Sequence, residues 1–211
     1  MVGPTVDKLC ARMYSEGQGQ KRGKSVDSLI MKTLANIDIL NEDEAGRELS
    51  IVMDNCGGQN KNRMVLRLAL YLVEVGYFET VNLIFLVRGH TKNPCDRMFN
   101  TLKKDYHRSN CYTFPMLADM LRSENVEVRP VEEEDWENWD AFLDKFYMRF
   151  QSGTVQCNHI FSVTPQHGET VMSLCEADGE EIKVRKFKRG KSTLEERRAT
   201  MKETPRDKIP F

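Results

Sequence analysis

The sequence contains no long apolar run. No stretch approaches the roughly 20 apolar residues that a membrane-spanning helix requires, and residues 1–17 (MVGPTVDKLCARMYSEG) lack the apolar centre of a secretory signal. We therefore expect an intracellular protein, with the nucleus as one possible compartment, and no membrane partner.

Closely spaced cysteine pairs are also lacking. Six cysteines are scattered through the 211 residues, a chain long enough to bury a core without covalent staples. Reduced thiols are therefore favoured over disulfides. A zinc site built from Cys157, His159 and Cys175 is the alternative, but it is weaker because no CxxC pair is present.

The chain has no excess of charge of either sign. Its formal net charge is −1, which gives no global reason to expect a polyanionic partner. The balance hides a local asymmetry, since residues 132–144 carry seven acids and no base, whereas residues 183–191 carry six bases and no acid. We interpret the second segment as a basic strip that could contact nucleic acid.

Strand and helix patterns alternate over residues 25–131. Continuous apolar runs at 49–53 and 80–87 are typical of strands covered on both faces, and residues 25–37 have helical spacing. Asn60 is expected to cap a helix that ends at Gly76. Further elements are predicted as a helix beginning at Asn93 and Pro94, a helix at 114–122 and a strand at 126–131. This order predicts an α/β layer built on a parallel sheet.

The pattern changes after residue 131. An acidic helix carries Trp136 and Trp139 at the spacing of a packing face, and three strand-like segments follow at 154–163, 169–175 and 181–187. A charged helix and a loose tail end the chain. The predicted organisation is an α/β domain at 1–131 and a β-rich extension at 132–211.

Two carboxylates are notable for their positions. Asp54 ends a predicted buried strand, and Asp96 lies in the first turn of the helix that follows the next strand. Loops that leave the carboxyl ends of neighbouring parallel strands lie at one edge of a sheet, so we expect the two acids to converge there. Such a pair suits Mg²⁺ or Mn²⁺ and, with two ions, phosphodiester chemistry.

Structural roles could also explain these residues. Asp96 comes three residues after its expected cap, where a carboxylate favours the helix dipole in any protein. Asp54 could brace its own turn, with Gly57 and Gly58 supplying positive φ angles.

Basic side chains cluster near the same predicted edge. Lys61, Arg63 and Arg67 begin one helix, and a second group surrounds the other loop and helix: Arg88, His90, Lys92, Arg97, Lys103, Lys104 and Arg108. The cluster could neutralise a phosphate backbone, or it could be ordinary solvated helix surface. His90 could contact a metal or phosphate, or brace the loop.

Two motifs carry a family resemblance. DNCGGQNKN (54–62) followed by GHTKNPCDRMF (89–99) resembles a large family of transposon-associated proteins of oomycetes and invertebrates, whose shared pattern is close to DNCxGQNKN and then GH[ST]xxxxD. The resemblance spans about residues 14–130. It implies an RNase H-like three-layer fold of the DDE transposase kind, here with a partial sheet and a small β-rich C-terminal extension.

The resemblance also implies roles for individual residues. Asp54 and Asp96 are expected to be catalytic metal ligands for Mg²⁺ or Mn²⁺, with His90 beside them. Contacts to DNA or RNA are expected from eight residues: Asn55, Gln59, Asn60, Lys61, Arg63, Arg88, Lys92 and Arg97.

One departure from the family pattern concerns the first acid. An RNase H-like site takes an aspartate from the first strand of the sheet, which would precede residue 25, and Asp7 is the sole aspartate there. The sequence is therefore predicted to lack the first three strands and to be inactive as it stands. A non-catalytic nucleic-acid-binding domain is one alternative. A nucleotide-binding phosphotransferase is another, with residues 57–60 as a phosphate cradle, although GxGxxG and GxxxxGK[ST] are both absent.

Overall fold

The computed structural model describes ten segments of the chain: residues 9–14, 23–40, 46–86, 94–123, 125–148, 150, 154–166, 169–175, 181–184 and 194–203. The fold is a mixture of helices and two sheets, which confirms the predicted α/β class. The chain divides into two compact units. The small unit comprises residues 1–20, 89–135 and 211, and the large unit comprises residues 21–88 and 136–210.

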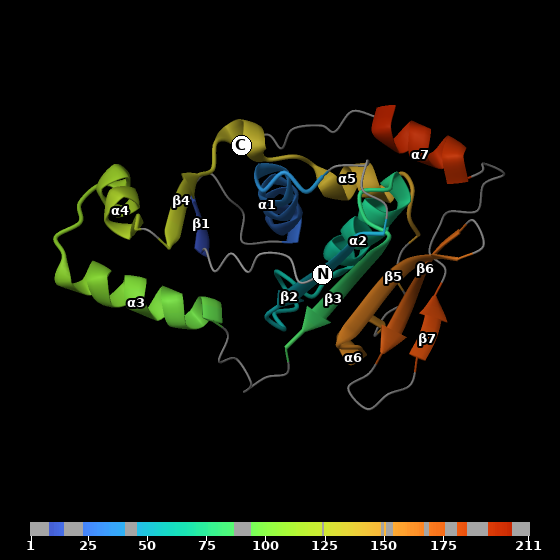
Figure 1. Ribbon diagram of the computed structural model, residues 1–211, viewed down its shortest axis with the longest axis horizontal. Coiled ribbons are helices and arrows are strands. Elements are labelled where there is room, and N and C mark those ends of the chain that lie inside the picture. Colours follow the sequence, from blue (N-terminus) through green and yellow to red (C-terminus); the bar gives the residue numbers. More distant parts are fainter. Residues whose placement is uncertain are drawn as a thin grey trace. The chain divides into compact units, whose positions relative to one another are not determined.

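The large unit contains a five-stranded sheet in the order β2-β3-β5-β6-β7 (Figure 1). Its strands are β2 (Glu48–Met53), β3 (Thr80–Phe85), β5 (Ile160–Gln166), β6 (Glu169–Cys175) and β7 (Glu181–Val184). β2 and β3 run parallel, whereas β5, β6 and β7 are added antiparallel. The segment predicted as a separate extension thus continues the same sheet through β5, so the units differ from the predicted division at residue 131.

The sheet has one buried face and one partly exposed face. Val81 and Leu83 of β3 are buried opposite Val163 and Phe161 of β5. On the other face the side chain of Asn82 bonds to Ser50 and Ser162 of its two neighbouring strands, and Val52 is 50% exposed. The expectation that both strands are covered on both faces is therefore wrong: their sequences alternate in burial because helices cover one side.

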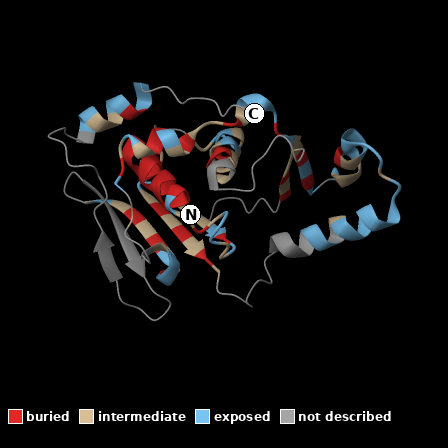
Figure 2. Ribbon diagram, turned by 180° about the vertical axis from the view of Figure 1, so that it is seen from behind, coloured by how far each residue is buried: buried red, intermediate tan, exposed pale blue. Residues whose placement is uncertain are grey.

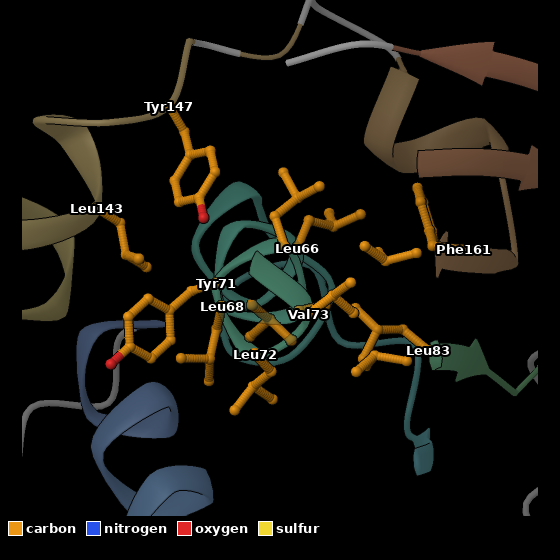
Figure 3. Packing of buried hydrophobic residues seen from close by; sticks show 14 of the residues in the cluster. Leu66, Leu68, Tyr71, Leu72, Val73, Leu83, Leu143, Tyr147 and Phe161 are labelled. Carbon is orange, nitrogen blue, oxygen red and sulfur yellow. The ribbon is translucent and has the colours of Figure 1, made fainter. Parts of the chain in front are cut away.

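Helix α2 (Arg63–Val75) is the centre of the large unit. It contacts β3, β5 and β6, and it also contacts α1 (Gly23–Asn36), α5 (Trp139–Asp144) and α7 (Leu194–Glu203). In Figure 3, Leu83 and Phe161 lie on one side of α2, and Leu143 and Tyr147 lie on the other. Every residue from 64 to 75 is buried, because the sheet and three helices pack around α2.

Two buried charges of α2 hold distant segments. The Arg67 guanidinium is fully buried and donates hydrogen bonds to Asp144 Oδ1 and to the carbonyls of Tyr147 and Met148. Glu74, also fully buried, accepts from Arg197 Nε of α7 at 3.0 Å. A buried charge is costly unless it is paired, so these contacts fix α5 and α7 against α2.

The small unit is built on a parallel pair of strands. β1 (Leu9–Met13) pairs with β4 (Val126–Pro130), and the other elements are α3 (Pro94–Arg108), α4 (Phe114–Leu121) and the 3₁₀ helix η1 (Glu133–Asp135). Its core consists of Leu9, Ala11, Ala118, Val126 and Val128, with Leu102 and Leu121 packed against them. β1 was not predicted.

Candidate metal and nucleic-acid site at the carboxyl end of β2

The parallel pairing of β2 with β3 places the first motif at a sheet edge. Met53 is in register with Phe85, so Asp54 follows β2 at the same edge where the chain leaves β3. Loops that follow parallel strands at such an edge commonly build ligand sites. The local arrangement predicted for Asp54 is therefore present.

The Asp54 carboxylate is exposed. In the part of the chain that the structure describes, its carboxylate oxygens accept no hydrogen bond, and only its backbone carbonyl is used, by Asn60 Nδ2 at 3.4 Å. The Asp54 side chain therefore does not brace its own turn. The purely structural role that the sequence also allowed for Asp54 required such a contact. A free carboxylate at this edge fits the oxygen ligand that Mg²⁺ or Mn²⁺ prefers.

The turn after Asp54 is organised around one carbonyl. Cys56 O accepts the N–H groups of Gln59, Asn60 and Lys61 at 3.2, 2.9 and 2.9 Å. The helix that follows starts at Arg63, and its N-cap is Asn62, whose Oδ1 accepts from Met64 and Val65. The predicted cap, Asn60, is thus wrong by two residues, because three amides folded onto Cys56 O delay the helix.

Gly57 and Gly58 are exposed, and neither adopts a positive φ, so the expectation that they do is wrong. A Cβ atom added to either would meet nothing within 4 Å. Neither backbone conformation nor internal packing requires glycine at these two positions. Their effect is to leave bare backbone beside Asp54.

Lys61 differs from the other predicted nucleic-acid contacts because it is buried, at 4% exposure. Its Nζ donates to Gln156 O at 2.9 Å and lies 5.7 Å from the centroid of the Phe85 ring. Burial lowers the pKa of the Lys61 amine, and nearby Cys157 acts in the opposite direction. A phosphate contact would require Lys61 to leave this position, whereas its present contacts tie α6 (Thr154–Cys157) to the end of β3.

Residues after α6 complete this edge. His159 Nδ1 lies 3.2 Å from Phe85 O, and Phe85 N donates to His159 O at 2.8 Å. Asn158 is 4% exposed. Sequence reasoning placed this segment in an appended unit, and no short motif signalled its position, because the contact depends on the antiparallel pairing of β5 with β3.

The remaining predicted contacts in the large unit differ in exposure. Gln59 is exposed, Asn55 and Asn60 are half-buried, and the Arg63 side chain is 46% exposed and lies 3.7 Å from Asp140 Oδ1. Gln59 and Arg63 can therefore meet a ligand from solvent without rearrangement.

The second motif, residues 89–99, belongs to the small unit, whereas Asp54 belongs to the large unit. Arg88, His90 and Lys92 fall outside the described residues. Asp96 and Arg97 lie in the first turn of α3, in the small unit, and their side chains are likewise outside the description. The pairing of Asp96 with Asp54 therefore stays a prediction, as does the role of His90.

The zinc alternative finds no support within the described part of the chain. No group of three or more His, Cys, Asp or Glu residues there could hold a metal ion. Among the described residues, Cys10, Cys56, Cys111 and Cys157 are free cysteines. None of the described helices is long and apolar enough to span a membrane.

Comparison with known proteins gives one family. No curated protein and no solved structure matches the chain. A domain family of unknown function, DUF7869, matches residues 21–178, which include both motifs and the strands that position Asp54. The chain belongs to the DUF7869 family.

Proposed function

We propose that the chain is a transposon-derived, RNase H-like domain of the kind that acts on nucleic acid through divalent-metal phosphodiester chemistry, and that residues 1–211 do not complete this reaction on their own. Asp54 and Asp96 would hold Mg²⁺ or Mn²⁺. A bound ion would polarise a phosphate oxygen and orient a water or hydroxyl group for in-line attack.

The observation that carries this proposal is the register of β2 with β3. The two strands run parallel and end together, so the DNC motif and the chain that leads to the GHT motif leave from one edge. An exposed carboxylate without hydrogen bonds from the described residues begins the first of these two segments.

The chain's own residues would position the nucleic acid. The bare backbone of Gly57 and Gly58 lets a phosphate backbone approach the turn, because the space where a Cβ atom would lie at either position is open. Gln59 and Arg63 offer exposed donors beside it. Lys61 would act indirectly, by fixing α6 at the end of β3.

Metal binding provides the first test. Mn²⁺ affinity, measured by electron paramagnetic resonance, should fall at least about tenfold in Asp54→Asn, because a carboxylate ligand is lost. Asp105→Asn, an exposed acid of α3, is the matched control and should bind as the wild type does. Equal Mn²⁺ affinity in wild type and Asp54→Asn would contradict the metal site.

Nicking of supercoiled DNA provides the second test. Two predicted carboxylates are fewer than a two-metal site usually requires, so we expect residues 1–211 to show no Asp54-dependent nicking in Mn²⁺. Nicking that disappears in Asp54→Asn would instead mean that a third carboxylate is supplied from within these residues, with Asp7 and Glu16 the nearest candidates upstream of the motif.

A non-catalytic nucleic-acid-binding domain remains the second candidate, favoured by the exposed basic residues of α3. The phosphotransferase alternative is weaker, because the Asn62 side chain already accepts from two N-terminal amides of α2 that a phosphate would otherwise use.

A further inference from the structure

An apolar groove opens on the small unit between β1, α3 and α4. Its volume is about 380 Å³, which lies within the usual range of about 300–1,000 Å³ for small-ligand pockets. Residues at helical spacing on the two helices form most of its lining: Phe99, Leu102, Tyr106, Phe114, Leu117 and Leu121. Residues 11–14, in and just after β1, also line it.

Three aromatic side chains that the helices contribute to this groove are exposed. Phe99 is 53% exposed, Tyr106 45% and Phe114 40%, whereas Leu102 is half-buried and packs against the core of the small unit. Clustered exposed aromatic residues mark a binding surface more often than single exposed apolar residues do. Their flat faces suit a planar, unsaturated ligand.

Positive charge accompanies these aromatic residues. Lys103 lines the groove, and Lys104 and Arg108 are exposed on the same helix. Arg12 also lines the groove, and its Nε and Nη2 atoms are buried without a hydrogen-bond partner among the described residues. A guanidinium with unused donors is expected to bind an anion or an acceptor-rich group.

We propose that this groove binds single-stranded nucleic acid, with bases stacked on Phe99, Tyr106 and Phe114 and phosphates held by Arg12, Lys103 and Lys104. This proposal rests on the proposed function, and it adds that the nucleic acid bound by the groove is single-stranded. Aromatic platforms beside cationic side chains are how single strands are bound without sequence preference.

A single strand fits these features better than a duplex does. Bases in a duplex are stacked and paired, so their faces cannot enter a groove unless the helix opens. The cations distinguish this occupant from a neutral apolar peptide, which would leave Lys103 and the free donors of Arg12 unmatched.

Fluorescence anisotropy in EDTA tests the proposal without metal. The probes are a labelled 15-nucleotide dT strand, a U strand of equal length, an abasic strand with the same phosphates, and a 15-base-pair duplex. Wild type should bind both single strands more tightly than the abasic strand or the duplex. The double variant Phe99→Ala/Tyr106→Ala should bind dT at least about tenfold more weakly and should no longer distinguish dT from the abasic strand.

Matched variants separate the groove from the general surface. Tyr112→Ala removes an aromatic side chain that is 81% exposed but does not line the groove, so it should change dT affinity by less than about twofold. Lys103→Gln should reduce the slope of log K against log salt by about 0.7, whereas Lys145→Gln in the large unit should not. Circular dichroism spectra should match wild type for all variants.

Three results would overturn the proposal. They are equal affinity for dT and abasic strands, tighter binding of the duplex, and equal effects of Tyr112→Ala and the groove variant. Binding of an apolar dye in the groove without any binding of dT would identify a protein- or lipid-docking face instead. Asp54→Asn should leave dT binding in EDTA unchanged, so loss of the metal site and loss of the groove are separate outcomes.

Discussion

Helices α2 and α3 both follow parallel strands that end at one sheet edge, yet their surroundings differ. All residues of α2 from 64 to 75 are buried, and even its charges Arg67 and Glu74 are enclosed. The described side chains of α3 are exposed apart from Leu102. Figure 2 shows α2 in red and most of α3 in pale blue.

This difference in burial suggests different roles for the two helices: α2 contributes mainly to stability and α3 mainly to binding. α2 packs between the sheet and three helices, so its substitutions should affect folding. α3 supports the small core through Leu102 and presents Phe99 and Tyr106 to solvent, so its substitutions should affect what the chain binds.

The largest expected effect is a cavity in α2. Leu66 is fully buried, so Leu66→Ala should lower the free energy of unfolding by about 2–5 kcal/mol. Urea unfolding followed by fluorescence is suitable, because Trp136 and Trp139 are both in the large unit. Phe99→Ala should leave this midpoint unchanged. An equal loss in both variants would remove the contrast between the helices.

The contact between α7 and α2 should have the next largest effect. Arg197→Met leaves the buried Glu74 carboxylate without its Nε donor, which should cost about 1–3 kcal/mol. Arg122→Met breaks an ion pair with Asp119 in which both side chains are exposed, and it should cost less than about 1 kcal/mol. Urea midpoints of the two variants give the comparison. Similar small losses would mean that α7 does not depend on this pair.

Buried Asp27 of α1 should make stability depend on pH. Burial, with Asp140 adding to it, raises the pKa of the Asp27 carboxyl well above its ordinary value of 3.8. Neither of its oxygens has a hydrogen-bond partner in the part of the chain that the structure describes. The folded state therefore holds this proton more tightly than the unfolded state. Stability from this group is complete below pH 3.8 and declines as pH rises toward the folded pKa.

The variant Asp27→Asn should remove that decline. Its advantage over wild type in urea midpoint should grow from pH 4 to pH 7, because the amide does not ionise. Asp105→Asn at an exposed position of α3 is the control and should follow wild type at each pH. A constant difference between Asp27→Asn and wild type would show that ionisation of Asp27 does not matter.

The smallest effect on stability should come from the exposed turn. Gly57→Ala and Gly58→Ala meet no neighbouring atom and need no positive φ, so unfolding should be unchanged or up to about 1 kcal/mol more costly. Gly76→Ala should instead lower the free energy of unfolding, because Gly76 has φ 95° and an added Cβ atom would lie against Arg198. If the turn contacts nucleic acid, Gly57→Ala should weaken DNA binding while unfolding is unaffected.

Local features of the fold could be predicted from the sequence. The predicted strand at 49–53 became β2 (Glu48–Met53), and Gly76 ends α2 in a left-handed conformation, because apolar runs and helix stops act locally. β1 was missed because its five residues, LCARM, become a strand only by pairing with β4, more than 100 residues later.

The candidate site was predictable only in part. Asp54 at a sheet edge follows from a strand followed by a glycine-rich turn. The burial of Lys61 does not, because it depends on Gln156 and Phe85, which no sequence pattern connects to it. The groove of the small unit was also missed, although Phe99, Leu102 and Tyr106 recur at helical spacing in the helix predicted to begin at Asn93.

The hydrogen-bond partner of Glu74 in α7 is synthesised long after Glu74 itself. Arg197 lies 123 residues further along the chain, and β5, β6, α5 and α7 all follow α2. At roughly 5–20 residues per second, Glu74 is synthesised roughly 6–25 s before Arg197. During that interval α2 lacks the part of its native cover that β5, β6, α5 and α7 provide, and Glu74 has not yet met Arg197. The nascent chain should therefore bind chaperones until α7 is synthesised, and ribosome stalling before residue 194 should prolong that association.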